Sequence, residues 1–465
     1  MRSIWAVAMN TVKQALRMKI ALIFIILLLV LLPTMALTST GDNTLKGRLQ
    51  TFVSYGLSLT SLLLCLLTLI VSAFTIASDL EHRQIYTVIT KPIKRSQFIL
   101  GKLLGVLLLS GALLVLFSGL IYCIVIYAPS YLHASPSEVE QVNNEFYTAR
   151  KALTPPEPDV REEVLRALGK LIRSGDIELV YKGMSETEIN ALERISKTGD
   201  VERIYKTMAD SDVIKQLTNV ARLSKRSAGV GRQIIWEFEN VRPTDPNGAL
   251  FVRFKFEAAA TPPDGQIYTR WAVGDYRSYI AGTAPMYQVV RRDPVKTFRE
   301  IQIPADAVAD DGYLAVVLLN DPVNNTSVTF PLEDGIKVLY KADTFAANFV
   351  KAVLIIGCRQ IFLACLGIFG ATFLSLPVAL LFSIVVFFTA NISAFVIDSF
   401  YYISDENIFF IYLYTIKLFV SLMPQFDKYA PSQYLVPAEL LTWSTVGWVV
   451  LRLVCLKAML LFVLG

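Results

Sequence analysis

The sequence has few of the residues and motifs that catalytic sites use. Its 465 residues include only two histidines, His82 and His133, and no HExxH or CxxC motif. Zinc sites and histidine-based proton relays need several such side chains at short spacings. The phosphate-binding motif GxxxxGK[ST] is also absent. We therefore expect a protein that is not an enzyme, that holds no metal and that binds no cofactor itself.

Charge is scarce as well, and it is unevenly distributed. Charged residues make up 18% of the chain, while the hydrophobic share is 54% and the mean hydropathy is +0.49, values that indicate a membrane protein. Residues 129–348 hold 27 of 44 Lys and Arg and 31 of 39 Asp and Glu, a net charge of −4 (27 − 31) against +9 (17 − 8) in the flanks. An acidic polar region argues against a nucleic-acid partner, and basic flanks are typical of membrane borders.

Six apolar runs are long enough to cross a bilayer as helices, which takes about 20 mostly apolar residues. They cover residues 20–38, 52–77, 102–127, 350–373, 376–397 and 444–464. A weaker run, Ile408 to Met423, contains Lys417 and is followed by Pro424. We interpret residues 407–423 as an external interfacial or re-entrant helix. A seventh span is the alternative, and it would place the C-terminus outside.

Lysine and arginine in short loops set the expected orientation, because basic loops stay in the cytoplasm. Four basic residues precede the first run, and five cluster from the end of the second run to Lys102 at the start of the third. Three crossings from a cytoplasmic N-terminus then place residues 129–348 outside, and six return the C-terminus to the cytoplasm.

Arg359 lies deep in the fourth apolar run, where a charge costs at least about 2 kcal/mol on insertion scales. Such a side chain must pair, snorkel or face the protein interior. The sequence leaves open whether Arg359 packs helices together or lies on a transport path.

The polar middle divides into a helical region, residues 129–231, and a strand-rich region, residues 232–345. Apolar residues at helical spacing in 162–172 predict a helix, and Ser185 with Glu188 forms a capping-box pattern. From residue 232 the apolar period changes to two, and seven or eight short strands predict a β-sandwich of jelly-roll kind. All five cysteines lie in apolar runs, so this α+β region must fold by packing alone.

Four aromatic residues of the strand-rich region are candidates for a carbohydrate-binding platform. They are Tyr268, Trp271, Tyr276 and Tyr279. Aromatic side chains more often fill a core or a sheet edge, so the core interpretation is favoured over the platform.

The stretch SDLEHRQIYTVITKPIKRSQFILGKLLG, from Ser78 to Gly105, joins the second and third apolar runs. It keeps more apolar positions than a solvated loop requires. The pattern predicts an amphipathic helix along the membrane face, broken at Pro92 and entering the third span at Gly101-Lys102. Such a helix can transmit force from a soluble partner.

In its acidic start, its KPIKR and the LGK that opens a span, this stretch resembles the coupling segment of the permease subunits of type-2 ABC transporters. Residues 1–128 and 346–465 would be two membrane halves with three spans each, and the external region an insertion between spans three and four. The residues matched by position are Asp79, Glu81, Arg83, Lys91, Pro92, Arg95, Gly101 and Lys102. The resemblance implies that the first two meet the ATPase and that the last two anchor the third span. It implies that Lys91, Pro92 and Arg95 shape the second turn of the segment.

The resemblance also implies partners and a location. A separate ATP-binding-cassette ATPase would carry ATP and Mg, and a second permease copy or homologue would complete a dimer in the lipid bilayer. A bacterial inner membrane, with residues 129–348 in the periplasm and a role in export or in the cell envelope, is expected. The alternative is a membrane-tethered envelope sensor or scaffold, which an associated ATPase would distinguish from a permease. The substrate is left open.

Overall fold

The computed structural model describes residues 2–81, 94–174, 201–207, 212–243, 248–260, 262, 264–332, 334–401 and 424–464. The chain forms two compact units. The first combines Met1–Arg150 with Asp343–Gly465, and the second is Lys151–Ala342.

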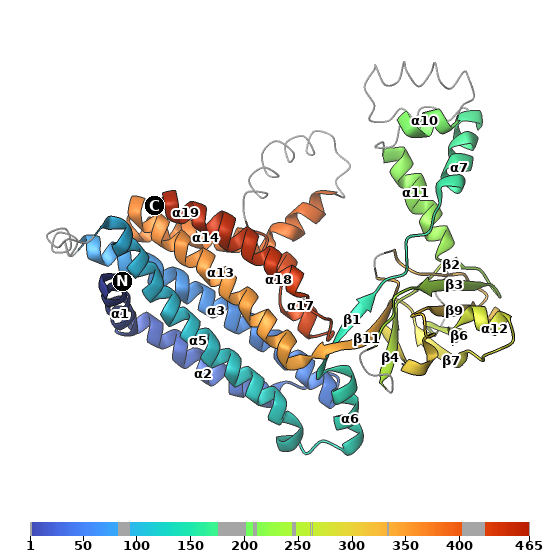
Figure 1. Cartoon of the computed structure of the whole chain (residues 1–465), viewed down its shortest axis with the longest axis horizontal. Helices are drawn as coiled ribbons and strands as arrows, with labels where there is room; N and C mark the ends of the chain where they lie inside the picture. Colours follow the sequence, from blue (N-terminus) through green and yellow to red (C-terminus); the bar gives the residue numbers. More distant parts are fainter. Residues whose placement is uncertain are drawn as a thin grey trace. The chain divides into compact units, whose positions relative to one another are not determined.

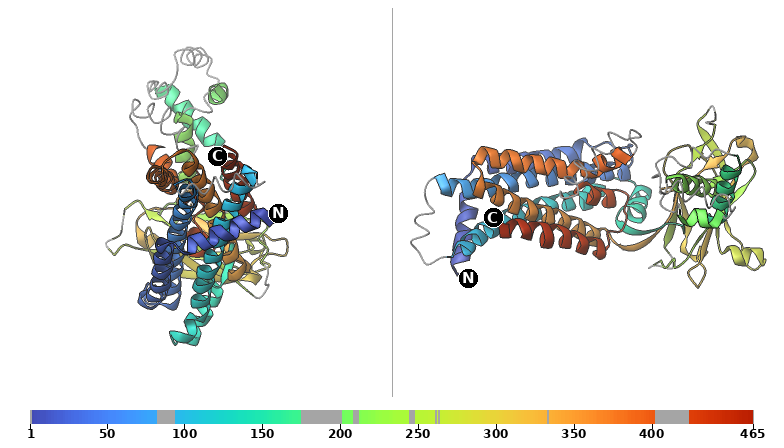
Figure 2. Two further views of the ribbon diagram at one scale, coloured as in Figure 1. Left: turned by 90° about the vertical axis from the view of Figure 1, so that its left-hand side faces the viewer. Right: turned by 90° about the horizontal axis from the view of Figure 1, so that it is seen from above.

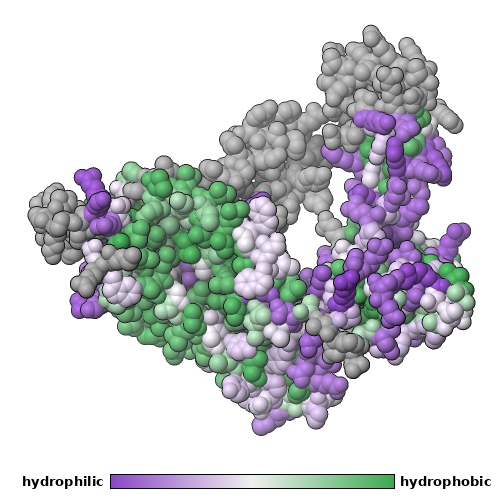
Figure 3. Space-filling model, in the orientation of Figure 1, coloured by the Kyte–Doolittle hydropathy of each residue, from purple (hydrophilic) through white to green (hydrophobic). Residues whose placement is uncertain are grey.

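The first unit contains, within its described residues, six helices long and apolar enough to cross a membrane, which confirms the six predicted spans. They are α2 (Lys19–Thr38), α3 (Leu45–Glu81), α5 (Arg95–Tyr131), α13 (Phe345–Phe373), α14 (Leu376–Tyr401) and a last helix made of α18 (Trp443–Val449), the π-helical η5 (Val450–Ala458) and α19 (Met459–Leu464). Apolar residues cover the visible surface of these helices (Figure 3). The predicted interfacial helix at 407–423 lies outside the described residues.

Helices α3 and α13 form the centre of this bundle. In the most apolar stretch of each helix 72% of the residues are buried, against 22% in α2 and in the last span. The two helices lie against each other (Figure 1). A Cβ added at Gly367 would lie 1.9 Å from Ser72 Oγ, so glycine is what lets the backbones approach. The other spans surround this pair.

The N-terminal helix α1 (Arg2–Leu16) does not run along the spans. It crosses one end of the bundle at a steep angle (Figure 2), and it packs against α5. At the other end of the bundle lies α6 (Pro136–Glu145), which Ser135 caps with the Ser–x–x–Glu box that its sequence offers. Short segments η4 (Asp427–Tyr429) and α17 (Ser432–Leu435) precede the last span.

The second unit begins with a small helical layer. Helices α7 (Arg161–Ser174), α10 (Val201–Thr207) and α11 (Asp212–Lys225) share a minor core around Val164, Leu168 and Ile214. The helix expected over 162–172 is therefore present, whereas the capping-box pattern at Ser185 falls outside the described residues.

The rest of the second unit is rich in β-strands, as predicted. The long strands are β1 (Thr148–Leu153), β3 (Gln233–Phe238), β4 (Ala249–Phe254), β6 (Gln266–Gly274), β7 (Tyr287–Pro294), β8 (Arg299–Pro304), β9 (Leu314–Asn320) and β11 (Ile336–Thr344). They form two four-stranded sheets in the orders β1-β11-β4-β8 and β3-β9-β6-β7. Inward residues of both sheets, such as Val252 and Val316, belong to one hydrophobic core, so the sheets pack as a sandwich.

The described part of this unit also contains three two-residue strands and a short helix. Strands β2 (Ser227–Ala228), β10 (Val328–Thr329) and β5 (Glu257–Ala258) form a third sheet, and α12 (Tyr276–Ile280) follows β6. Asp275 caps α12 by accepting hydrogen bonds from the backbone N–H groups of Arg277 and Ser278.

Candidate functional site

The expected coupling segment is anchored at its two ends by helices of the bundle. α3 ends at Glu81 and α5 begins at Arg95. Arg83, Lys91 and Pro92 lie in 82–93, outside the described residues, and the side chain of Glu81 is not described either. Arg95 is exposed in the first turn of α5, where a soluble partner could contact it.

A buried ion pair joins the two helices just inside these ends. Lys102 Nζ lies 2.7 Å from Asp79 Oδ2, and the two side chains are only 2% and 7% exposed. The same ammonium donates to Gln14 Oε1 and to the Thr75 carbonyl, each at 3.2 Å. An ammonium has three donors, and here α1 supplies one acceptor and α3 two. Asp79, expected from the resemblance to meet an ATPase, is thus paired inside the bundle.

Helix α1 packs closely on the first turns of α5. A Cβ at Gly101 would lie 2.7 Å from Val7 Cβ, and one at Gly105 would lie 2.6 Å from the Ala8 carbonyl oxygen. Any larger side chain would push the helices apart. Sequence reasoning singled out Gly101 but missed Gly105, although glycines four residues apart are a known signal of close helix packing in membranes.

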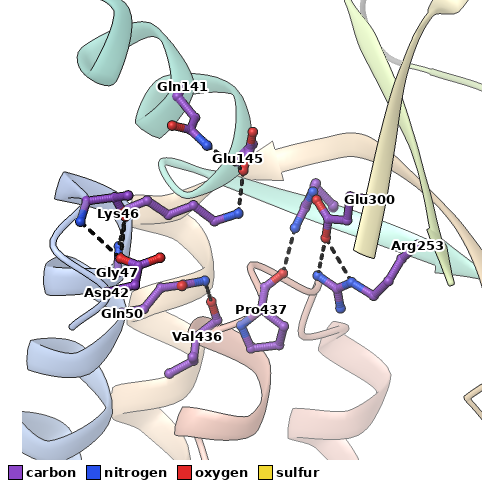
Figure 4. A network of polar contacts seen from close by, with 12 residues as sticks. Asp42, Lys46, Gly47, Gln50, Gln141, Glu145, Arg253, Glu300, Val436 and Pro437 are labelled. Carbon is purple, nitrogen blue, oxygen red and sulfur yellow. Dashed lines mark hydrogen bonds and ion pairs between the residues drawn. The ribbon is translucent and has the colours of Figure 1, made fainter. Parts of the chain in front are cut away.

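Polar contacts also fix the opposite end of α3 (Figure 4). Lys46 forms an ion pair with Glu145 of α6, and Gln50 Nε2 donates to the Val436 carbonyl at 2.7 Å. Both ends of α3 are therefore tied to neighbouring elements by polar side chains.

Arg359 lies inside the bundle, and its side chain ties α13 to the segment before the last span. It is 7% exposed, and its Nη2 donates to the carbonyl oxygens of Phe426 and of Tyr429, the latter at 2.9 Å. The guanidinium also lies 5.4 Å from the centre of the Phe426 ring. These contacts fit the helix-packing interpretation. Arg359 also lines a pocket of about 230 Å³, so the transport-path interpretation stays open.

The region that contains these contacts matches a known family. Residues 5–137 match the family described as ABC-2 family transporter protein, a stretch that includes most of α1, the first three spans and both ends of the expected coupling segment. The chain carries an ABC-2 transporter permease domain. No curated protein and no solved structure gives a significant match. The family is a transmembrane component of ABC transporters, so the chain is a multi-pass membrane permease.

In this permease the four aromatic residues of the strand-rich region do not form one platform. Trp271 is 1% exposed, and its ring lies 4.5 Å from Phe254 in the sandwich core. Its Nε1 donates to Thr269 Oγ1 at 2.9 Å, which satisfies the indole inside the core. The platform prediction is wrong for Trp271, because the side chain is needed for packing.

The three tyrosines lie apart from Trp271 in the permease. Tyr268 is 37% exposed near the start of β6, and Arg292 lies over its ring at 5.0 Å. Tyr276 and Tyr279 stack at 6.5 Å on α12, beyond the other end of β6. About six residues of extended strand, roughly 20 Å, separate the two places. Only the α12 tyrosines could contact a common ligand.

Proposed function

We propose that a separate ATP-binding-cassette ATPase drives this permease and that residues 78–102 form the coupling segment it engages. The observation that carries the proposal is the buried Asp79–Lys102 pair with its Gln14 contact. It joins the helix that enters the segment to the helix that leaves it, and it connects both to α1. A push on the segment would therefore move three helices together rather than bend one loop.

Movement also requires that the ATPase distinguish two states of the permease. A partner shifts a conformational equilibrium only by its difference in affinity for the two states. Exposed Arg95 is suited to contact the partner, since exposed charges serve docking more than folding. Buried Asp79 and Lys102 are suited to carry the movement inward. In this proposal some of the eight residues matched by position contact the ATPase, and the others transmit the movement into the bundle.

The wider proposal is an exporter or cell-envelope system in a bacterial inner membrane. Its second unit would lie in the periplasm, as the basic loops predict. Two permeases would form the path as a symmetric dimer, and the low burial of α2 and of the last span supports a surface that lipid or a second copy covers. The sandwich would be a jelly roll, since successive long strands change sheet along the chain except at the β6–β7 pair.

Copurification and ATPase assays test the coupling proposal. A charge-reversed variant, Glu81→Lys with Arg95→Glu, should insert normally but bind or stimulate the ATPase at least about tenfold more weakly, as expected for lost charge contacts at an interface. The matched control is Glu162→Lys with Arg166→Glu, which reverses an exposed ion pair on α7 and should leave the ATPase unaffected.

Two results would contradict the proposal. One is that no ATPase associates with the wild-type chain, which would favour the envelope sensor or scaffold. The other is unchanged association and turnover in the charge-reversed variant, which would remove the coupling role from this segment.

A further inference from the structure

The pocket beside Arg359 has the size of a small ligand site and lies within the membrane unit. Its volume is about 230 Å³, and it lies between α3, α13, α14 and residues 430–432. For comparison, an engineered apolar cavity of about 150 Å³ admits benzene. The lining is largely apolar, with polar atoms from Ser58, Ser61, Asn391 and Ser432. The pocket thus has room for a group the size of a lipid headgroup.

Arg359 gives this pocket a positive charge with unused hydrogen-bonding capacity. Its Nη2 is occupied by two carbonyl oxygens, but its buried Nε has no partner among the described residues. A buried donor without a partner costs about 1–3 kcal/mol. Asp427 interacts with Arg359 electrostatically, yet none of the described residues that line the pocket is acidic. An incoming anion would therefore meet a positive charge without a carboxylate in its way.

The mouth of the pocket is accessible from the side of α3. Ser58 is exposed and Leu62 is 39% exposed, and both line the pocket. Leu57, Ile356 and Phe387 add apolar surface. A charged group could therefore enter with an apolar chain behind it that stays in contact with apolar side chains or lipid.

We infer that this pocket binds the anionic group, a phosphate or a carboxylate, of an amphiphilic molecule. A guanidinium forms strong charge-assisted hydrogen bonds to such groups, and an intramembrane arginine that faces a cavity is an expensive feature in a bundle. The inference rests on the proposed function, because the amphiphile would be the substrate class that the permease moves.

Ligand binding to the purified full chain in neutral detergent tests the inference without any ATPase. The probes are dioctanoyl phosphatidylglycerol, dioctanoylglycerol and inorganic phosphate, which separate an anionic amphiphile from a neutral one and from a free anion. Phosphatidylglycerol should bind the wild type at least about tenfold more tightly than the other two. Arg359→Gln should lose about tenfold of that affinity, the value of one charge-assisted hydrogen bond.

Two further variants make the test specific. Ser58→Phe would fill the mouth while keeping the charge, and it should block binding even where Arg359→Gln fails to fold. Arg452→Gln is the matched control, because Arg452 lies over the Trp448 ring and does not line the pocket; it should bind like the wild type.

Equal binding of the two lipids would overturn the inference. The inference would also be overturned if inorganic phosphate bound as tightly as phosphatidylglycerol. Wild-type affinity for phosphatidylglycerol in Arg359→Gln or in Ser58→Phe would overturn it as well. Such a failure would leave the coupling proposal standing, because association with the ATPase is measured separately.

Discussion

The Asp79–Lys102 pair allows the energetics of the coupling region to be tested directly. Both side chains are almost fully buried and 2.7 Å apart. Removing one partner leaves an uncompensated buried charge, which costs about 3–5 kcal/mol. Replacing both residues with apolar side chains of similar volume removes the attraction between the two charges, but it also removes the cost of burying them. The net effect on the stability of the fold is therefore often neutral or favourable. We therefore expect Asp79→Leu and Lys102→Met each to destabilise the bundle strongly, and the double variant to recover most of the loss.

The assay is a double-mutant cycle on unfolding of the full chain in detergent or mixed micelles. The double variant still loses the bonds to Gln14 and Thr75, worth about 1 kcal/mol each. With single losses of about 3–5 kcal/mol each and a remaining loss of about 2 kcal/mol in the double variant, the expected coupling free energy is at least about 4 kcal/mol. The control cycle uses Arg161 and Glu202, which are 2.6 Å apart but about half exposed, and should give at most about 1 kcal/mol. Additive effects at Asp79 and Lys102 would refute the reasoning, since the two charges would then not depend on each other.

Three other predictions concern packing, topology and pH. Gly105→Leu should destabilise the bundle by about 1–3 kcal/mol, because the side chain meets α1; an unchanged melting temperature would contradict the close contact. In a background without native cysteines, a cysteine at Lys94 should react only from the cytoplasm and one at Tyr276 only from outside, and the reverse would invert every span. The second unit should fold when expressed alone and lose stability as the pH falls below about 4, because the hydrogen bond from Arg277 lowers the pKa of Asp311 in the folded state. A carboxyl whose folded pKa is lowered stabilises above its unfolded pKa and stops doing so as it is protonated. The variant Asp311→Asn should lose less stability at low pH than the wild type in acid unfolding curves. A curve identical to that of the wild type would exclude the Asp311 carboxyl as a source of the pH dependence.

Several features of this permease follow from the sequence alone because they depend on local composition and period. A run of about 20 apolar residues is long enough to span a membrane wherever it lies in the chain, so the six membrane-capable helices were predictable. Alternation of apolar residues likewise marks strands such as β3 and β4 without knowledge of their partners. The resemblance to the permease family was recognisable from the KPIKR and LGK residues between two spans.

Other features depend on which elements meet in space, and only the tertiary structure decides that. Lys102 could be recognised as a charge opening a span, but its partner Asp79 lies 23 residues earlier on another helix (102 − 79). Arg359 and its carbonyl partner at Tyr429 are 70 residues apart. For Trp271 the sequence favoured a role in the core over one on a platform, and the packing of the second sheet against it decided for the core. The spacing of apolar residues along a single sequence indicates where a helix or a strand forms. The partner of a buried charge, in contrast, depends on how elements far apart in the chain pack against each other.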